Sequence, residues 1–208
     1  GSGKSTVMKL CARFYDPQKG CIFFNGVPMN EINPESLMSH ISMVFQDVSL
    51  FQDTIRNNIR FGKTDAPEEE IIAAAKKACC DDFIMRLPKG YDTLVGEGGC
   101  TLSGGEKQRI SIARAMLKDA QIILLDEATA SLDPENEVEV QKAIDSLIKG
   151  RTVIAIAHRL KTIKDADQII VLDNGRIKEE GTHDDLVRNE GLYAHLWNIQ
   201  ESISGWKL

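Results

Sequence analysis

The chain lacks several features that would mark special classes of protein. It has no apolar run near the length of about 18 residues that a membrane-spanning helix needs, and it has no low-complexity segment. It also lacks a basic balance, because 31 acidic residues outnumber 25 basic ones and give a net charge of −6. Nucleic-acid-binding domains usually carry a basic surface, so this balance argues against a nucleic-acid partner. The hydrophobic share of 42% is typical of a folded domain with a sizeable core.

Cysteine is scarce and irregularly spaced. The five cysteines are Cys11, Cys21, Cys79, Cys80 and Cys100, two of them adjacent and none in a C-x-x-C pair. An odd count without metal-ligand spacing argues against a disulfide framework or a zinc site. Free thiols in a reducing compartment are therefore the prediction.

The first six residues, Gly1-Ser2-Gly3-Lys4-Ser5-Thr6, resemble the end of a phosphate-binding loop. In the pattern G-x-x-x-x-G-K-[ST], the second glycine, the lysine and the hydroxyl residue match Gly3, Lys4 and Ser5. The first glycine of the pattern would precede residue 1, so we expect the chain to begin inside the motif. A short Gly-Ser run is also typical of a cloning remnant, so these residues alone leave both interpretations open.

Apolar segments alternate with helical patterns along most of the chain. We expect strands at residues 21–24, 41–45, 121–125, 152–157 and 168–172, of which 121–125 and 152–157 read as buried. We expect helices at 5–13, 34–40, 54–60, from a cap at Asp65 to 79, at 82–87, 106–117, 134–148 and 159–164, and from 183 and 192. Such alternation predicts a parallel sheet covered by helices on both faces, with the helical stretch 54–117 inserted into it.

One of these strands ends in two carboxylates. The apolar residues 122–125 lead into Asp126 and Glu127, and ligands bind at the carboxyl ends of strands in such sheets. In phosphate-loop NTPases an aspartate at this place holds Mg²⁺, and Glu127 would then orient or deprotonate an attacking water. A turn that happens to be acidic is the alternative.

A second glycine-containing helix start lies at residues 102–106. Ser103 is placed to cap the helix that follows, and Gly104 and Gly105 expose backbone N–H groups that suit an anion. Ser103 and Glu106 also fit a plain capping box. The two interpretations are compatible, because a well-capped helix start is what builds an anion site.

Residues 102–106 resemble the signature motif of ATP-binding-cassette ATPases, and the other motifs of that family occur in its order. These are the phosphate loop at 1–6, the Q-loop glutamine Gln46, the Walker B end Asp126-Glu127, the D-loop Ser131-Leu132-Asp133 and the switch histidine His158. The resemblance covers nearly the whole chain. It implies an α/β fold of the P-loop NTPase (RecA-like) type, with a parallel-sheet core of residues 1–50 and 119–208. An α-helical subdomain at 51–118, which carries the signature motif, is inserted into this core.

Further segments resemble the exporter type of this family. Residues 93–99 resemble its X-loop, and 126–133 and 180–186 have the same character. Glu106 departs from the signature, which more often has Gln at this position. The resemblance implies the nucleotide-binding domain of a lipid, drug or peptide exporter, usually fused behind a transmembrane domain. We therefore expect an N-terminally incomplete chain that lies at the cytoplasmic face of the cell membrane.

The resemblance also implies ligands and roles. ATP and Mg²⁺ are the expected ligands, Glu127, His158 and Gln46 the catalytic residues, and Ser5, Gln46 and Asp126 the metal-binding ones. Nucleotide contacts are implied for Gly1, Ser2, Gly3, Lys4, Ser5, Thr6, Ser103, Gly104, Gly105, Glu106 and Asp133. The partner would be a second nucleotide-binding domain, identical or paralogous, in a head-to-tail dimer that holds each ATP between the phosphate loop of one subunit and the signature of the other.

Two other functions remain open at this point. One is a soluble ATPase of the same family that acts on ribosomes or DNA, which the X-loop-like residues 93–99 and the acidic charge disfavour. The other is a chain that is inactive when isolated, with weak nucleotide affinity and poor stability. The basic residues of 107–114 and Lys76-Lys77 read as solvated helix faces, and no role is assigned to His40, His183 or His195.

Overall fold

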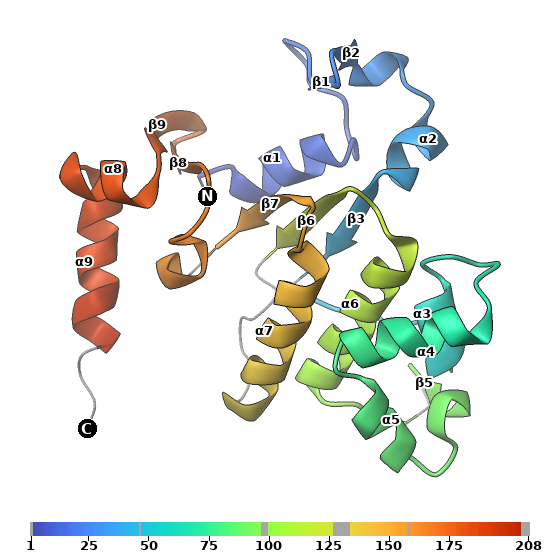
Figure 1. Cartoon of the computed structure of the whole chain (residues 1–208). Coiled ribbons are helices and arrows are strands. Elements are labelled where there is room, and N and C mark those ends of the chain that lie inside the picture. The colour runs from blue at the N-terminus through green and yellow to red at the C-terminus, as the bar shows by residue number, and fades with distance from the viewer. Residues whose placement is uncertain (1, 46, 97–99, 127–133, 158, 205–208) are drawn as a thin grey trace. The chain divides into compact units, whose positions relative to one another are not determined.

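The computed structural model describes residues 2–45, 47–96, 100–126, 134–157 and 159–204. The chain divides into two compact units (Figure 1), one of residues 1–17 with 155–208 and one of residues 18–154. Each unit is described by itself. Over the described ranges, no helix is long and apolar enough to cross a membrane.

The unit of residues 18–154 contains most of the helices. They are α2 (Pro34–Ser39), α3 (Ile55–Arg60), α4 (Glu68–Lys77), α5 (Asp81–Arg86), α6 (Gly104–Lys118) and α7 (Pro134–Ile148), with the 3₁₀ turns η1 (Met29–Glu31) and η2 (Gly90–Asp92). Its strands are β1 (Phe23–Phe24), β2 (Val27–Pro28), β3 (Ile41–Val44), β4 (Asp53–Thr54), β5 (Leu94–Val95), β6 (Ile122–Asp126) and β7 (Thr152–Ile156), the last two residues of which belong to the other unit.

The central sheet has the strand order β3-β6-β7. β3 and β6 are parallel, in a register that pairs Ile41 with Ile122 and Val44 with Leu125. Apolar runs of this kind suit strands covered on both faces, and β6 is buried along residues 123–125. The predicted parallel sheet and the buried strand at 121–125 are therefore confirmed. The prediction that 152–157 is also buried is wrong: Ile154 is 40% exposed, and no residue of β7 is in the buried core.

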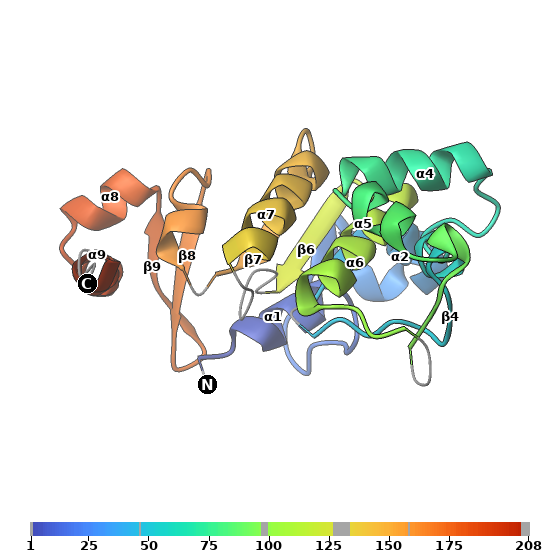
Figure 2. The same cartoon turned by 90° about the horizontal axis from the view of Figure 1, so that it is seen from below.

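The helix α6 lies in the middle of the core. It packs against α7, β3, α3 and α4, and Figure 2 shows α4 and α5 beside it. Ile110 and Ile112 are both fully buried although, two residues apart, they point to different sides of the helix. A helix with apolar residues on several faces is stable only where other elements surround it, and this is the case for α6.

A short antiparallel pair, β4 with β5, was not predicted inside the helical stretch 54–117. Strands of two residues leave no alternating pattern in the sequence, so this pairing has no local signal. Gly96 follows β5 with a φ of 93°, and a Cβ at this position would lie 2.9 Å from the Cα of Gln52. Glycine therefore allows the two segments to approach each other here.

The start of α4 also differs from the prediction. We expected Asp65 to cap this helix, but the N-cap residue is Pro67, and no side chain caps the helix. Three glutamates, Glu68, Glu69 and Glu70, occupy the first turn instead. Their charges favour the positive end of the helix dipole without a capping hydrogen bond.

The unit of residues 1–17 and 155–208 contains α1 (Lys4–Cys11), η3 (Leu160–Ile163), β8 (Ile169–Asp173), β9 (Arg176–Gly181), α8 (His183–Arg188) and α9 (Leu192–Ser204). β8 pairs with β9 as an antiparallel hairpin, so the expectation that 168–172 joins the parallel sheet is wrong. The turn Asn174-Gly175, in which both residues have positive φ, closes this two-residue hairpin. Ile169, Leu186 and Tyr193 form the small core of this unit.

The contact between the end of α3 and α6 yields a prediction. A Cβ at Gly62 would lie inside van der Waals contact of the Arg114 carbonyl oxygen and 3.3 Å from the backbone nitrogen of Lys118. We expect Gly62→Ala to lower the free energy of unfolding by about 2 kcal/mol or more, because backbone atoms must move apart. Urea denaturation measures this change.

Gly150→Ala is the matched control for that experiment. Gly150 has a φ of 73° with open space around it, so its substitution adds only backbone strain of about 1 kcal/mol. If Gly62→Ala destabilises the protein no more than Gly150→Ala does, then the end of α3 does not pack as closely against α6 as described.

Candidate functional site

The helix α1 begins directly after a glycine in the left-handed region. Gly3 has φ 96° and ψ 3°, and no side chain caps the helix that starts at Lys4. The carbonyl of Ser2 accepts a hydrogen bond from the N–H of Gly175 (3.2 Å), and the Lys4 ammonium donates to the Ser2 hydroxyl (3.2 Å). A helix start without a side-chain acceptor suits an anionic ligand. The predicted helix after the loop is confirmed, and Gly1 lies outside the described residues.

The side chains of Lys4, Ser5 and Thr6 are exposed on the first turn of α1. An ammonium and two hydroxyls lie next to helix N–H groups that have no acceptor within the helix. All of these groups can donate hydrogen bonds, and none of them is a carboxylate. Such a set is suited to phosphate oxygens, which are acceptors only.

The carboxyl end of β6, in the unit of residues 18–154, carries a second set of candidate residues. Asp126 is the last residue of this strand, and β3 runs parallel beside it with Val44 opposite Leu125. Both strands therefore end at the same edge of the sheet. Four residues after β3, β6 and β7, to which the sequence assigns catalytic, nucleotide or metal roles, lie outside the described part of the chain: Gln46, Glu127, Asp133 and His158.

No group of three or more His, Cys, Asp or Glu side chains that could hold a metal ion occurs among the described residues. The predicted metal ligands with described positions are Ser5 and Asp126, which belong to different units. A hydroxyl and a carboxylate fit Mg²⁺, since this ion takes few protein ligands and completes its shell with water and phosphate oxygens.

The start of α6 is a complete capping box. The Ser103 hydroxyl accepts from the N–H of Glu106 (3.3 Å), and the Glu106 carboxylate accepts from the N–H of Ser103 (2.8 Å). This confirms the predicted cap. Glu at position 106 thus satisfies a backbone donor, as Gln would. Ser103 and Gly104 are exposed at this helix start, whereas Gly105 is buried.

A side chain of α6 reaches the end of β3. Gln108 is 3% exposed, and its amide donates to the carbonyl of Phe45 (3.2 Å). Phe45 directly precedes Gln46, so the helix that begins at the signature-like residues is bonded to the segment of the predicted Q-loop.

Two arginines of α6 are not on a solvated face, contrary to the prediction from the sequence. The basic residues of 107–114 were expected to form a solvated face, but Arg109 is 6% exposed and Arg114 is partly buried. Arg109 donates to the side-chain oxygen of Asn136 on α7 (3.0 Å) and lies over the ring of Phe83. The prediction failed because both guanidiniums have partners on other elements, which the helix sequence by itself does not contain.

Asn58 is a buried polar side chain that forms hydrogen bonds with Arg114 and with backbone groups of residues 51–54. It is 1% exposed, and its amide donates to the carbonyls of Phe51 and Thr54, both at 3.0 Å. Its side-chain oxygen accepts from the N–H of Phe51 (2.9 Å) and from Arg114 (3.1 Å). Arg114 also donates to the Asn58 carbonyl (2.8 Å). Asn58 thus fixes residues 51–54, which follow the predicted Q-loop, onto α6.

The guanidinium of Arg114 lies near two aromatic rings. Its centre is 5.2 Å from the ring of Phe51 and 5.8 Å from that of Phe61, and the two ring centroids are 4.6 Å apart. Burial lowers the pKa of Arg114 from its ordinary value. A guanidinium is effectively always protonated in proteins, so Arg114 stays charged and keeps its cation–π contacts.

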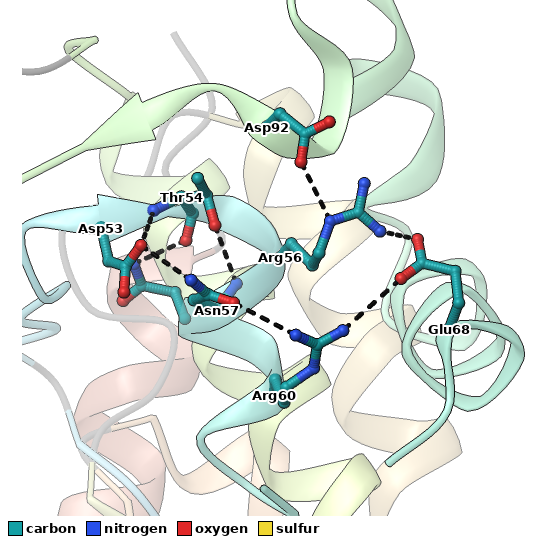
Figure 3. A network of polar contacts seen from close by, with 8 residues as sticks. Asp53, Thr54, Arg56, Asn57, Arg60, Glu68 and Asp92 are labelled. Carbon is teal, nitrogen blue, oxygen red and sulfur yellow. Dashed lines mark hydrogen bonds and ion pairs between the residues drawn. The ribbon is translucent and has the colours of Figure 1, made fainter. Parts of the chain in front are cut away.

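An ion-pair network on α3 ties three elements together (Figure 3). Arg56 pairs with Glu68 at the start of α4 and donates to Asp92 in η2 (3.0 Å). Arg60 contacts the other oxygen of Glu68 (3.7 Å). These side chains are partly exposed, so each pair contributes at most about 1 kcal/mol. Together they orient α3 toward both neighbours.

The same network reaches β4 through Asn57. Its amide donates to Asp53 (2.9 Å), and its side-chain oxygen accepts from Arg60 (3.4 Å). The hydrogen bond from Asn57, followed by that from the N–H of Thr54, holds the pKa of Asp53 below its ordinary value. Asp53 is therefore charged at neutral pH and acts as an acceptor for the end of β4.

The residues that connect these segments were not predicted from the sequence. They are Asn58, Gln108, Arg109, Arg114 and Asn136. The available signal was a polar residue on the apolar face of a helix, such as Asn58, which follows Ile55 by three residues and precedes Ile59. A buried polar residue at such a position is kept where it has partners.

Asn58 and Asn57 offer a matched pair for testing this connection. We expect Asn58→Ala to lower the free energy of unfolding by about 3 kcal/mol, because buried groups of Phe51, Thr54 and Arg114 lose their partner. The neighbouring Asn57→Ala removes exposed contacts and should cost about 0.5 kcal/mol. Urea denaturation of both variants measures this, and equal losses would contradict the role of Asn58.

Comparison with known proteins agrees with this geometry. The family model described as "ABC transporter" matches residues 1–130. The chain is 53% identical over 201 residues to a protein of Legionella pneumophila (strain Paris) named ATP-dependent lipid A-core flippase, covering 97% of this chain and 34% of that protein. It is 52% identical over 200 residues to an ABC transporter of Aspergillus oryzae, covering 96% of this chain and 25% of that one.

A solved structure is similar over nearly the whole chain. It is described as a bacterial Atm1-family ABC exporter with ATP bound, and it matches with a TM-score of 0.88 and 49% identity. The match covers 96% of this chain and 35% of that one. The chain therefore spans about a third of the length of the flippase and of this exporter, and a quarter of that of the Aspergillus transporter.

Proposed function

Because this chain belongs to the ABC transporter family, as the nucleotide-binding domain of an exporter-type member, we propose that it binds and hydrolyses ATP to power export across a membrane. The observation that carries this proposal is the start of α1, where Gly3 is left-handed, no side chain caps the helix, and Lys4 and Ser5 are exposed. Such a helix start presents N–H groups and a cation to an anionic ligand.

We assign the nucleotide contacts residue by residue. Gly1, Ser2, Gly3 and Thr6 surround the phosphates with backbone and hydroxyl donors, and the Lys4 ammonium neutralises charge on the β- and γ-phosphates. Ser5, Gln46 and Asp126 are the residues that would hold Mg²⁺. This ion, when bound, supplies charge stabilisation at the phosphate oxygens.

The catalytic roles fall to residues at the carboxyl ends of the strands. Glu127 follows β6 and orients or deprotonates the attacking water. His158 follows β7 and contacts the γ-phosphate side, and Gln46 follows β3 and responds to the metal. Support for this proposal comes from the parallel β3–β6 pair, which ends both strands at one sheet edge.

The second anion site makes the proposed active unit a dimer. The exposed Ser103 and Gly104, with Gly105, Glu106 and their capping box, would bind the γ-phosphate of an ATP held by the partner subunit's phosphate loop. Asp133 would contact the same nucleotide. A head-to-tail pair of identical or paralogous domains follows, in which the charge of the γ-phosphate holds the two subunits together and hydrolysis loosens them.

We further propose that this domain works with a transmembrane domain in the same protein, at the cytoplasmic face of the membrane. The threefold greater length of the flippase and exporter relatives supports this. A lipid, drug or peptide is the proposed class of cargo. Within the domain, we assign residues 1–50 and 119–208 to the catalytic core and 51–118 to the inserted helical part.

The role of Lys4 is tested by a charge-removing substitution. We expect Lys4→Met in the full-length protein to weaken ATP binding by at least about tenfold, which corresponds to about 1.4 kcal/mol. Binding of a fluorescent ATP analogue measures this. Lys9→Met is the control, since Lys9 is exposed on the same helix but outside the proposed phosphate contacts. Equal affinity of both variants for the ATP analogue would show that Lys4 does not contact the nucleotide.

The role of Glu127 is tested separately. We expect Glu127→Gln to bind ATP with unchanged affinity and to accumulate ATP-bound dimers, because the water is no longer activated. Size-exclusion chromatography of the full-length protein with ATP and a hydrolysis assay measure the two effects. Hydrolysis at the rate of the unmodified protein would show that another group acts on the water.

A further inference from the structure

We propose that Asn136 is a positioning residue for the ATP-binding residues 103–106, and that Gly105 is glycine because Asn136 occupies the space of its side chain. This inference rests on the proposed function, since it assigns a role to the neighbours of the proposed phosphate-binding helix start. Glycine can be required in this motif for two reasons: close approach of the backbone to a phosphate, or close packing against another helix. The proposal assigns Gly105 to the second reason.

The packing at Gly105 is unusually close. A Cβ there would lie 2.5 Å from the Cβ of Asn136 and 2.6 Å from its Cγ and Oδ1. Non-bonded carbon atoms do not approach to such a distance. Because the Cβ of Asn136 is fixed to the backbone, a change of rotamer alone does not relieve the overlap, and the first turn of α7 would have to move.

A second contact holds Asn136 in this position. The Arg109 guanidinium donates to the Asn136 side-chain oxygen (3.0 Å) and is 6% exposed. Arg109 follows Gly105 by four residues, so both lie on the same face of α6. The ring of Phe83, 5.2 Å from the guanidinium, supports Arg109 from α5. Gly105 and Arg109 therefore both lie against the side chain of Asn136 on α7.

The position of Asn136 in the chain gives this contact a consequence. It is the third residue of α7, which begins at Pro134, directly after the residues 131–133 that resemble a D-loop. The capping residue Ser103 lies two residues before Gly105. A displacement of the start of α7 would therefore, through the contact of Asn136 with Gly105, also displace the proposed phosphate-binding helix start in the same subunit.

A double-mutant experiment with the full-length protein separates packing from phosphate approach. The proteins are the unmodified form, Gly105→Ala, Asn136→Gly and the double variant. Thermal unfolding without nucleotide reports on packing alone. We expect Gly105→Ala to lower the melting temperature, and the double variant to lose less than the sum of the two single losses. Strictly additive losses would overturn the proposal.

The ATPase measurements then test positioning. We expect Gly105→Ala to lower kcat at least tenfold and to change KM less than threefold, because the phosphate loop that first binds ATP is intact. The double variant should recover kcat to within threefold of Asn136→Gly. A double variant as slow as Gly105→Ala would instead place the role of this glycine in phosphate approach and would overturn the inference.

The matched control is Gly105→Ala combined with Val138→Gly. Val138 is 54% exposed on the same helix, so this change adds an equivalent glycine to α7 without relieving the overlap, and it should restore neither kcat nor melting temperature. Recovery in this control would contradict the proposal. If the unmodified protein does not hydrolyse ATP, the proposed function fails, whereas the nucleotide-free melting experiment still decides the Gly105–Asn136 contact.

Discussion

The unit of residues 18–154 depends on how it accommodates the partly buried charge of Arg114. Removing a guanidinium from water costs several kcal/mol unless hydrogen bonds replace the lost hydration. Both oxygens of Asn58 accept from Arg114, and the rings of Phe51 and Phe61 lie near its planar group. Because the guanidinium fork is rigid and directional, it favours one position of α3 along α6. Apolar packing between the same helices would stabilise the contact but would tolerate sliding.

The same helix makes two more buried polar contacts, and each leads to a segment next to a predicted motif. Gln108 bonds to Phe45 before the predicted Q-loop, and Arg109 bonds to Asn136 after the predicted D-loop. Asn58, the partner of Arg114, holds residues 51–54. A continuous α-helix of 15 residues does not bend easily between such points. Under the proposed function, α6 is therefore the element that keeps the phosphate-binding start at Ser103 in fixed relation to both segments.

Features of the fold that follow from neighbouring residues could be predicted from the sequence. The bounds of α7, the buried strand β6 and the capping box at Ser103 all rest on periodicity or on residues within one turn. Features that depend on distant partners could not be predicted. The pairing of β4 with β5 and the burial of Arg109 join segments separated by 27 residues or more. The motifs of the candidate site predict ligand chemistry, whereas the hydrogen bonds from α6 to Phe45 and Asn136 required the structure.

Gly3, Gly62 and Gly105 show why a motif is an incomplete description of a site. Gly3 is needed for its left-handed backbone, and Gly62 and Gly105 for the absence of a Cβ next to a neighbouring helix. Within the signature-like residues, Gly104 is exposed and Gly105 is buried. Ligand contact can constrain the first directly, but the second also faces Asn136. A short motif can therefore combine the requirements of a ligand with those of helix packing. Substitution at either glycine alone does not distinguish the two requirements, because both predict a loss of activity.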